Sequence, residues 1–314
     1  MACRLCPHQC TIADGRAGRC HVRRNERGTL KATTYERVAA VAMDPIEKKP
    51  LYHFHPGSSI LSLGQAGCTL GCEFCQNWHL LSPQVPQHRL TPQDAVRLAR
   101  QQGSVGIAYT YNEPYVGFEY VLATSGEARA AGLKNVLVTN GYYMPEPFAE
   151  LAPLTDAMNI DLKSIRDEFY KKYCHGELAP VQRTIETAVQ KGIHVELTNL
   201  LVTGLNDSEA DITGLVDYVA GVGRDVPLHF SRYFPAHKMD LPPTPTASLR
   251  MAYQIGRQKL SYVYVGNVIG MEGSDSVCPA CGAVLIQRSG YAIGVCELKG
   301  NRCGRCGAEL NFIV

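Results

Sequence analysis

Short apolar segments that alternate with helical patterns are the feature of this sequence that most limits its possible folds. The clearest helical pattern covers residues 91–103, in which Thr91 or Asp94 marks the start and Gly103 marks the end. Repeated units of strand and helix predict a parallel sheet. We expect its strands at residues 60–64, 106–111, 135–140, 157–163, 194–202, 227–233 and 262–267.

Six or seven such units predict an α/β fold whose sheet closes partly or fully into a barrel, with a flat doubly wound sheet as the alternative. We favour a partial (β/α)6 barrel of the TIM type over residues 36–270 of the 314-residue chain. Both arrangements place bound ligands at the carboxyl ends of the strands. Two small cysteine-rich segments, residues 1–35 and 271–314, would flank the barrel as metal-binding appendages.

The sequence contains 13 cysteines, which is a high number for a protein of the cytoplasm, the compartment that we expect. No apolar run reaches the roughly 18 residues of a membrane span, and the first residues lack the apolar stretch of a signal peptide. We therefore expect a cytoplasmic protein without a membrane partner. Thiols stay reduced there, so metal binding explains the 13 cysteines better than disulfides do.

The charge of the chain gives little reason to expect a nucleic-acid partner. The formal net charge is only +2, which produces no strong field around the whole molecule. The first 31 residues are locally rich in arginine. They are open to two interpretations, a solvated basic surface or a docking patch for an acidic partner or RNA.

Three closely spaced cysteines directly follow the first predicted strand. Cys68, Cys72 and Cys75 have the spacing C-x3-C-x2-C. A structural zinc site and an ordinary [4Fe–4S] cluster each need four protein ligands. A site that is one ligand short keeps a coordination position free for a substrate. We therefore expect a cluster with one open iron, and the alternative is a zinc ion completed by His79 or by a distant residue.

The segment from Cys68 to Cys75, with Phe74 before the last cysteine, resembles the signature of the radical SAM superfamily. The resemblance implies a partial or full (β/α) barrel and a [4Fe–4S] cluster held by these three cysteines. It also implies that the open iron binds S-adenosylmethionine, whose reductive cleavage gives methionine and a 5′-deoxyadenosyl radical that abstracts hydrogen from a substrate. Phe74 would pack beside the adenine or the cluster.

Segments at the ends of later predicted strands extend this resemblance. The segment containing Tyr111, Asn112 and Glu113 resembles the family's Gly-Gly-Glu segment, with Tyr111 and Asn112 in place of the glycines. The resemblance implies that Glu113, aided by Asn112, pairs with the ammonium group of the cofactor. The segments around Asn140 and around Asp161 resemble cofactor-contacting segments of glycyl-radical-enzyme activases, such as pyruvate formate-lyase activating enzymes.

The activase resemblance implies further cofactor contacts. Asn140, Asp161 and Lys163 would position the carboxylate, ammonium or ribose of the cofactor, and His229 would contact the ribose. With the cysteines at both ends, the chain as a whole resembles the radical SAM component of the AmmeMemoRadiSam system. That resemblance also implies a reductant such as flavodoxin or ferredoxin, and a protein substrate or companion pathway proteins as partners.

Each of these residues also has an ordinary structural interpretation. Glu113 precedes a proline and could cap a helix. Asp161 and Lys163 share one face of a strand, where they could form a structural ion pair. Asn140 could belong to a turn, and His229 could be a satisfied core residue. Cys174 stands apart from the other cysteines, and we interpret it as a surface residue.

The cysteines at the two ends of the chain form two more groups. Cys278, Cys281, Cys303 and Cys306 resemble a zinc ribbon, with an auxiliary iron–sulfur cluster as the alternative and Cys296 as a substitute ligand. Zinc and a second cluster are equally open for the N-terminal group, where His8 and His21 could compete as ligands. This group consists of Cys3, Cys6, Cys10 and Cys20.

The sequence therefore favours a radical SAM enzyme with an unidentified substrate. An activase that installs a glycyl radical on a partner protein is the alternative. A non-enzymatic, multi-zinc nucleic-acid adaptor that uses the terminal cysteines and the basic N-terminal segment is a more distant one.

Overall fold

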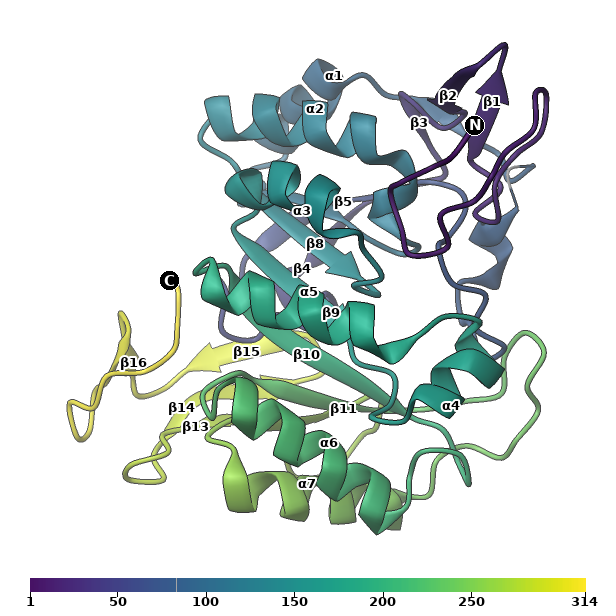
Figure 1. Ribbon diagram of the computed structural model, residues 1–314. Coiled ribbons are helices and arrows are strands. Elements are labelled where there is room, and N and C mark those ends of the chain that lie inside the picture. Colours follow the sequence, from purple (N-terminus) through teal and green to yellow (C-terminus); the bar gives the residue numbers. More distant parts are fainter. Residues whose placement is uncertain (83) are drawn as a thin grey trace.

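A single eight-stranded sheet forms the centre of the molecule (Figure 1). The computed structural model describes residues 1–82 and 84–314. β4 (Ala40–Pro45) pairs antiparallel with the first of seven parallel strands. These seven strands are β5 (Ser59–Gly64), β7 (Gly106–Tyr109), β8 (Lys134–Thr139), β9 (Ala157–Asp161), β10 (His194–Leu201), β11 (Leu228–Arg232) and β12 (Val263–Gly266).

The parallel strands lie side by side in chain order, from β5 to β12, and the order never reverses. A doubly wound sheet requires a reversal at its switch point. The expected partial (β/α)6 barrel is therefore confirmed, and the flat alternative is wrong. β5 begins one residue before its expected range, the other six parallel strands are slightly shorter than or shifted from theirs, and β4 lies where no strand was expected.

Helices connect the parallel strands and cover the outer side of the sheet (Figure 1). Right-handed crossovers between neighbouring parallel strands place all connecting helices on one side. The α-helices are α1 (Pro92–Gln101), α2 (Phe118–Ala130), α3 (Pro145–Leu151), α4 (Asp167–Phe169), α5 (Leu178–Gln190), α6 (Glu209–Val222) and α7 (Thr246–Lys259). A π-helical turn, Tyr170–Cys174, continues α4, and short 3-10 turns occur at Ile46–Lys48, Trp78–Leu81, Pro114–Gly117 and Ala152–Leu154.

The start of α1 follows the predicted signals. The hydroxyl of Thr91 accepts a hydrogen bond from the Asp94 N–H at 3.1 Å, and Pro92 occupies the first helical position. Thr91 is thus the cap, and Asp94 is inside the first turn. The helix ends at Gln101, shortly before Gly103, whose φ of +65° lies in the left-handed region that glycine adopts without strain.

The two cysteine-rich segments lie at different ends of the barrel. The N-terminal segment carries β1 (Arg23–Glu26) and β2 (Thr29–Ala32), and β3 (Arg37–Val38) pairs with β6 (His88–Arg89). Its His8 Nε2 lies 2.8 Å from the carbonyl of Thr69, beyond the carboxyl end of β5. The C-terminal segment forms β13 (Ser276–Val277), β14 (Val284–Ser289), β15 (Ala292–Val295), β16 (Leu298–Lys299) and β17 (Arg302–Cys303).

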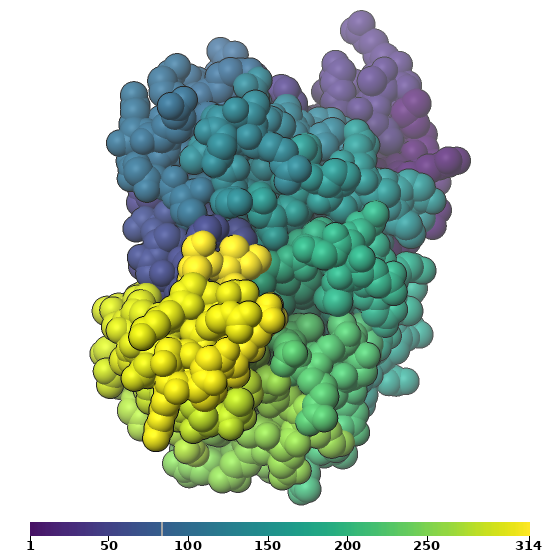
Figure 2. Space-filling model, turned by 90° about the vertical axis from the view of Figure 1, so that its left-hand side faces the viewer, coloured from purple at the N-terminus to yellow at the C-terminus, as the bar shows by residue number. Residues whose placement is uncertain are grey.

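The C-terminal segment closes the end of the barrel where the parallel strands begin. Arg288 donates to the carbonyl of Tyr52 at 2.9 Å, and the ring of Phe312 stacks on that of His53 with centroids 3.8 Å apart. Figure 2 shows the segment as a yellow lobe, away from the purple N-terminal residues. The catalytic end of such a barrel is the opposite one. None of the helices among the described residues combines the length and the apolar character that crossing a membrane requires.

A buried carboxylate joins this lobe to the sheet. Glu196 of β10 is fully buried and accepts the N–H groups of Tyr52 at 3.0 Å and His53 at 2.8 Å. The imidazoles of His194 and His229 lie 3.1 and 2.7 Å from its two oxygens. Burial alone would raise the pKa of Glu196, but the hydrogen bonds from the two histidines lower it well below its ordinary value.

We predict that Glu196 makes the fold sensitive to acid. A carboxyl with a lowered pKa stabilises the folded state above its unfolded pKa of about 4.3, and this contribution is lost as the pH falls through the folded pKa. The free energy of unfolding should therefore fall more steeply below pH 5 in the wild type than in Glu196→Gln. Urea unfolding followed by circular dichroism at pH 5, 4 and 3 measures the difference. Parallel curves for the two proteins would contradict the prediction.

Candidate active site

The cysteine triplet lies on a loop that leaves β5 at its carboxyl end. Gly67 has a φ of +87°, and a side chain there would meet the carbonyl oxygen of Cys20 at 2.5 Å, so the turn requires glycine. Two backbone hydrogen bonds fix the loop against the π-helical turn. Gly71 N–H donates to the carbonyl of Cys174 at 3.0 Å, and Glu73 N–H donates to the carbonyl of Tyr173 at 2.9 Å.

The triplet faces a cavity of about 230 Å³ at the carboxyl ends of the strands. Most of the predicted site residues meet here. The lining includes the predicted Cys68, Cys72, Phe74, Cys75, Asn112, Asn140, Asp161 and Lys163, and also Gln76, Asn77, Leu81, Tyr111, Thr198, Leu200 and Ser231. Residues from five strand ends and one loop therefore converge on one space, as expected for a barrel of this class.

Asn140 links the triplet to the end of β8. Its amide nitrogen donates to the hydroxyl of Thr69 at 3.0 Å and lies 3.5 Å from Cys68 Sγ. Its amide oxygen accepts from Tyr142 N–H at 2.9 Å, which fixes the orientation of the amide. Asn112 is held similarly, because its amide nitrogen donates to the carbonyl of Gly67 at 2.6 Å.

A partly buried cation lies on the other side of the cavity. Lys163 Nζ lies 3.0 Å from Asp161 Oδ2 and 6.0 Å from the centre of the Phe74 ring. Burial alone would lower the pKa of Lys163, but Asp161 and the thiols of Cys72 and Cys174 raise it well above its ordinary value. The lysine therefore keeps its positive charge beside the sulfur atoms. The charge of Lys163 would stabilise a carboxylate, or another anionic group held by the cysteine sulfurs, in the cavity.

Cys174 does not lie on the surface, so that expectation is wrong. It is fully buried at the end of the π-helical turn, and a hydrogen bond from its thiol lowers the pKa of Cys72. Burial raises the pKa of Cys75 to about 11. A bound metal would replace these proton equilibria, because a coordinating thiol is deprotonated outright.

Glu113 is fully buried and does not line the cavity. Its carboxylate accepts from the N–H groups of Tyr115 at 3.0 Å and Asn140 at 2.9 Å, and from the hydroxyls of Thr139 and Tyr143. Burial raises its pKa to about 7, although these hydrogen bonds act in the opposite direction. Glu113 also caps the turn that begins at Pro114, as its ordinary interpretation predicts.

His229 lies in the interior below the cavity rather than along it. Its ring contacts Glu196 and packs against Tyr52 and Tyr264, with centroids 4.7 and 5.0 Å away. Ser231, two residues further along the same strand, lines the cavity instead. Sequence reasoning missed Ser231 and Thr198, although strand alternation places both on the inner face with His229 and Glu196. His79 is exposed and is not part of the lining.

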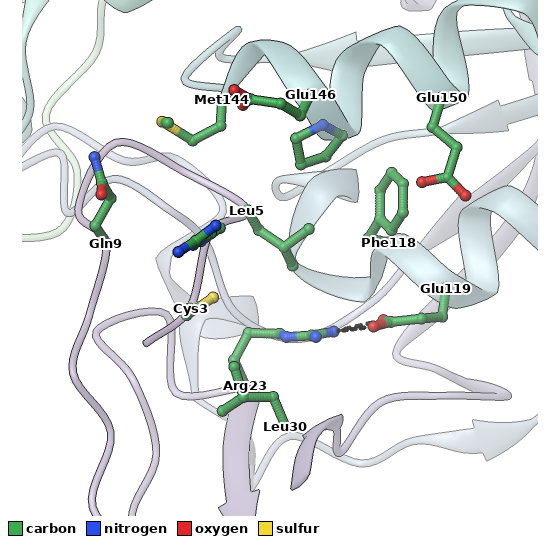
Figure 3. Close-up of a pocket in the computed structure, with 12 residues that line it drawn as sticks. Cys3, Leu5, Gln9, Arg23, Leu30, Phe118, Glu119, Met144, Glu146 and Glu150 are labelled. Carbon is green, nitrogen blue, oxygen red and sulfur yellow. Dashed lines mark hydrogen bonds and ion pairs between the residues drawn. The ribbon is translucent and has the colours of Figure 1, made fainter. Parts of the chain in front are cut away.

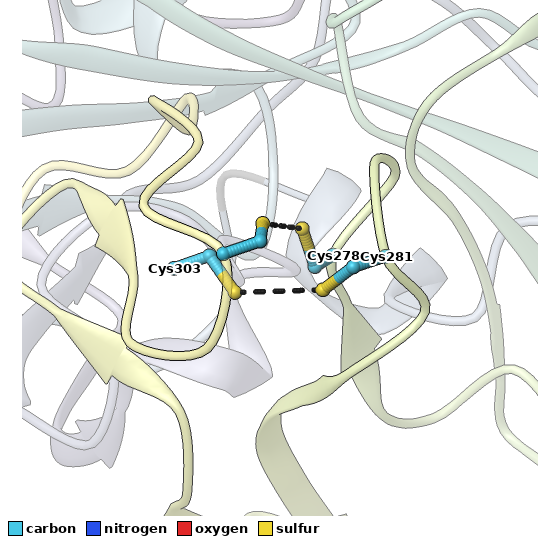
Figure 4. A group of neighbouring side chains, drawn as sticks. Cys278, Cys281 and Cys303 are labelled. Atoms are coloured by element: carbon cyan, nitrogen blue, oxygen red, sulfur yellow. Dashed lines mark hydrogen bonds between the residues drawn. The ribbon is translucent and has the colours of Figure 1, made fainter.

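The C-terminal cysteines form a compact group that could hold a metal. Figure 4 shows Cys278 and Cys281 on one loop facing Cys303 on another. The Sγ atoms of Cys278 and Cys306 are 3.7 Å apart, and those of Cys281 and Cys303 are 3.8 Å apart. All four sulfurs lie within 4.8 Å of one another. Four sulfurs around a zinc ion, each at about 2.3 Å, stand about 3.8 Å apart.

A larger hollow of about 690 Å³ lies outside the barrel, between the N-terminal segment and helices α2 and α3. Figure 3 shows Arg23 reaching Glu119 across it, at 2.5 to 2.6 Å. Its lining includes Arg23 and Leu30 of the β1–β2 hairpin but no residue of the eight-stranded sheet. The smaller cavity at the triplet is the better candidate for catalysis, because it combines sulfur ligands, a partly buried cation and strand ends.

Comparisons with known proteins agree with this site. The family model of the Radical SAM superfamily matches residues 63–219. A protein of Methanocaldococcus jannaschii that is described as uncharacterized is 42% identical over 322 aligned positions, which cover 100% of this chain and 96% of that protein. A radical SAM methyltransferase from Sphaerobacter thermophilus has a similar fold, with a TM-score of 0.54 and 18% identity over 74% of this chain and 71% of that one.

A second solved structure with a similar fold is SuiB of Streptococcus suis bound to its precursor peptide SuiA. The TM-score is 0.51 and the identity is 15%, over 71% of this chain and 51% of that one. The match to the family model spans half of the 314 residues and contains the triplet, Asn140, Asp161 and Lys163. On its sequence, its fold and its site, this chain belongs to the radical SAM superfamily.

Proposed function

We propose that the protein reductively cleaves S-adenosylmethionine at a [4Fe–4S] cluster and uses the resulting radical to abstract hydrogen from a substrate. The observation that carries the proposal is the convergence of Cys68, Cys72 and Cys75 on a cavity that also contains Lys163 and Asn140. Among the described residues, the C-terminal group alone gathers three or more metal-ligating side chains tightly enough for a single ion. The looser spacing of the triplet suits a cube of iron and sulfide.

The cluster would be held by the three cysteines, which leave one iron without a protein ligand. When bound and reduced, it supplies one electron that breaks a sulfonium C–S bond of S-adenosylmethionine, giving methionine and a 5′-deoxyadenosyl radical. A low-potential reductant, such as a flavodoxin or a ferredoxin, would return that electron. Transfer of the radical to a glycine of a partner protein is one use of it, but nothing in the described residues favours that use over a smaller substrate.

The protein's own side chains would bind and orient the cofactor. Lys163, kept charged by Asp161, would face the carboxylate of the methionine moiety, and Phe74 would exclude water from the cluster. Asn140 would donate a hydrogen bond to the sulfur of Cys68, which is one way in which proteins adjust the potential of a cluster. Thr198 and Ser231 would offer hydroxyl groups to the ribose.

We propose that Glu113 positions Asn140 instead of contacting the cofactor. Its four donors lie in the 3-10 turn that follows β7 and in the end of β8 with the loop after it, and its burial leaves no open side toward the cavity. We also propose zinc for the C-terminal group, because its sulfur separations match a tetrahedral ion. The ion would support a small lobe that lacks a large core of its own.

Cleavage of S-adenosylmethionine is the first test. The wild type, reconstituted anaerobically with iron and sulfide and reduced with dithionite, should form 5′-deoxyadenosine. Cys72→Ala should lose the iron bound by the triplet and fall to background product, because the triplet cluster loses one of its three protein ligands. Cys296→Ala is the matched control, since Cys296 is exposed and belongs to neither site. An intact cluster in the wild type without any 5′-deoxyadenosine would overturn the proposed function.

Lys163 should contribute to cofactor binding. Lys163→Met keeps the length of the side chain but removes its charge, and we expect the Kd for S-adenosylmethionine to rise roughly tenfold, or about 1.4 kcal/mol. The control is Lys171→Met, because Lys171 forms an exposed ion pair with Asp167 at 2.7 Å, outside the cavity. Calorimetry on the reconstituted proteins measures both constants. Equal affinities for the two variants would exclude the assigned role.

Removal of Glu113 should cost stability. Glu113→Ala leaves three buried donors without their acceptor, namely the N–H groups of Tyr115 and Asn140 and the hydroxyl of Thr139. Each unsatisfied group costs about 1–3 kcal/mol before the structure relaxes. We expect the free energy of unfolding to fall by about 3 kcal/mol or more in denaturant titrations. A control at the exposed Glu146→Ala should change it by less than about 0.5 kcal/mol. A stable Glu113→Ala protein that binds S-adenosylmethionine poorly would instead support direct contact with the cofactor.

A further inference from the structure

The four N-terminal cysteines surround one small, enclosed space. Cys3, Cys6, Cys10 and Cys20 all line a cavity of about 20 Å³. The backbone folds them toward it, because Cys3 N–H donates to the carbonyl of Cys10 at 2.9 Å and Gln9 N–H donates to that of Cys6 at 3.1 Å. In addition, Arg23 N–H points at Cys20 Sγ from 3.5 Å. Backbone N–H groups directed at sulfur are typical of thiolates that bind metal centres.

The spacing of these cysteines differs from that of the C-terminal group. In the C-terminal group the facing sulfurs are 3.7 and 3.8 Å apart, which fits one ion. No three of the N-terminal sulfurs are that close, since the C-terminal cysteines are the sole group within 4.8 Å of one another in residues 1–82 and 84–314. Four thiolates that share a cavity but stand further apart fit a larger group, such as a cube of iron and sulfide.

The walls of the cavity favour the same group. Leu5, Ile12 and Val116 make them largely apolar. Tyr115 also lines the cavity and is fully buried, and its hydroxyl has no hydrogen-bond partner among the described residues. A buried hydroxyl without an acceptor is costly, and a sulfide or thiolate of a cluster would accept from it.

The cavity adjoins the loop that carries the triplet. Thr69, which directly follows Cys68, lines the cavity as well, and the carbonyl of Thr69 is hydrogen-bonded to the imidazole of His8. The carbonyl of Cys20 lies against Gly67 of the same loop. The N-terminal cysteines are therefore packed behind the catalytic loop, while the C-terminal group sits in the lobe at the opposite end of the barrel.

We infer that Cys3, Cys6, Cys10 and Cys20 hold a second [4Fe–4S] cluster that is fully ligated by the protein. With no open iron, this cluster binds no substrate, and its chemistry is limited to gaining and losing one electron. The inference does not depend on the proposed function, because it concerns cysteines outside the catalytic triplet.

A variant without the catalytic triplet isolates the second cluster. The chain with Cys68→Ala, Cys72→Ala and Cys75→Ala, reconstituted anaerobically with iron and sulfide, should retain about four irons and four sulfides per chain. After reduction it should show the electron paramagnetic resonance signal of a [4Fe–4S]+ cluster. Adding Cys6→Ala and Cys20→Ala should remove the iron, whereas adding Cys296→Ala should not. One zinc ion per chain in all of these variants would show that the C-terminal lobe remains folded.

A second measurement guards against a misfolded triple variant. The otherwise unchanged chain should contain about eight irons, and Cys6→Ala with Cys20→Ala should contain about four and keep the triplet cluster. The inference is overturned if the triple variant binds two zinc ions and no iron, or if the unchanged chain holds about four irons that the N-terminal substitutions leave in place. Failure to cleave S-adenosylmethionine, by contrast, would bear only on the proposed function.

Discussion

A single buried carboxylate organises the catalytic end of this barrel. Glu113 lies between the ends of β7 and β8 and accepts hydrogen bonds from Asn140 N–H and the Thr139 hydroxyl. Asn140 in turn reaches Thr69 and the sulfur of Cys68, so the position of the triplet loop depends on the carboxylate behind it. In the low dielectric of the interior these bonds are strong, and leaving any of them unmade is costly. The arrangement holds sulfur ligands still before any metal binds them.

The same end of the barrel is fixed a second time by the π-helical turn. The carbonyls of Tyr173 and Cys174 accept the N–H groups of Glu73 and Gly71, which flank Cys72. π-Turns are rare and occur mostly at functional sites. Here the turn delivers a buried thiol and two backbone acceptors to a loop that has no regular structure of its own. The loop therefore obtains its rigidity from distant segments of the chain, which a preorganised metal site requires.

The two ends of the barrel contain different polar groups. At the carboxyl ends, Lys163 and Asp161 border an open cavity and can exchange partners with a ligand. At the amino ends, Glu196 is enclosed by His194, His229 and the backbone of residues 52–53, so its hydrogen-bonding capacity is already used. The C-terminal lobe covers that closed end, and the N-terminal cysteines support the open one. Metal groups at the two ends would thus serve different purposes, stability at one and electron chemistry at the other.

The sequence by itself determined the strand–helix order, the triplet with its missing fourth ligand, and the residues at strand ends such as Asn140, Asp161 and Lys163. These depend on local patterns, and parallel strands bring their carboxyl ends to one edge whatever the details of packing. Only the tertiary structure decided that Glu113 faces inward, that His229 belongs to the closed end, and that Cys174 lies beside Cys72. Burial decides such matters, together with contacts between segments that lie 27, 33 or 102 residues apart, and a pattern within a single segment does not contain this information.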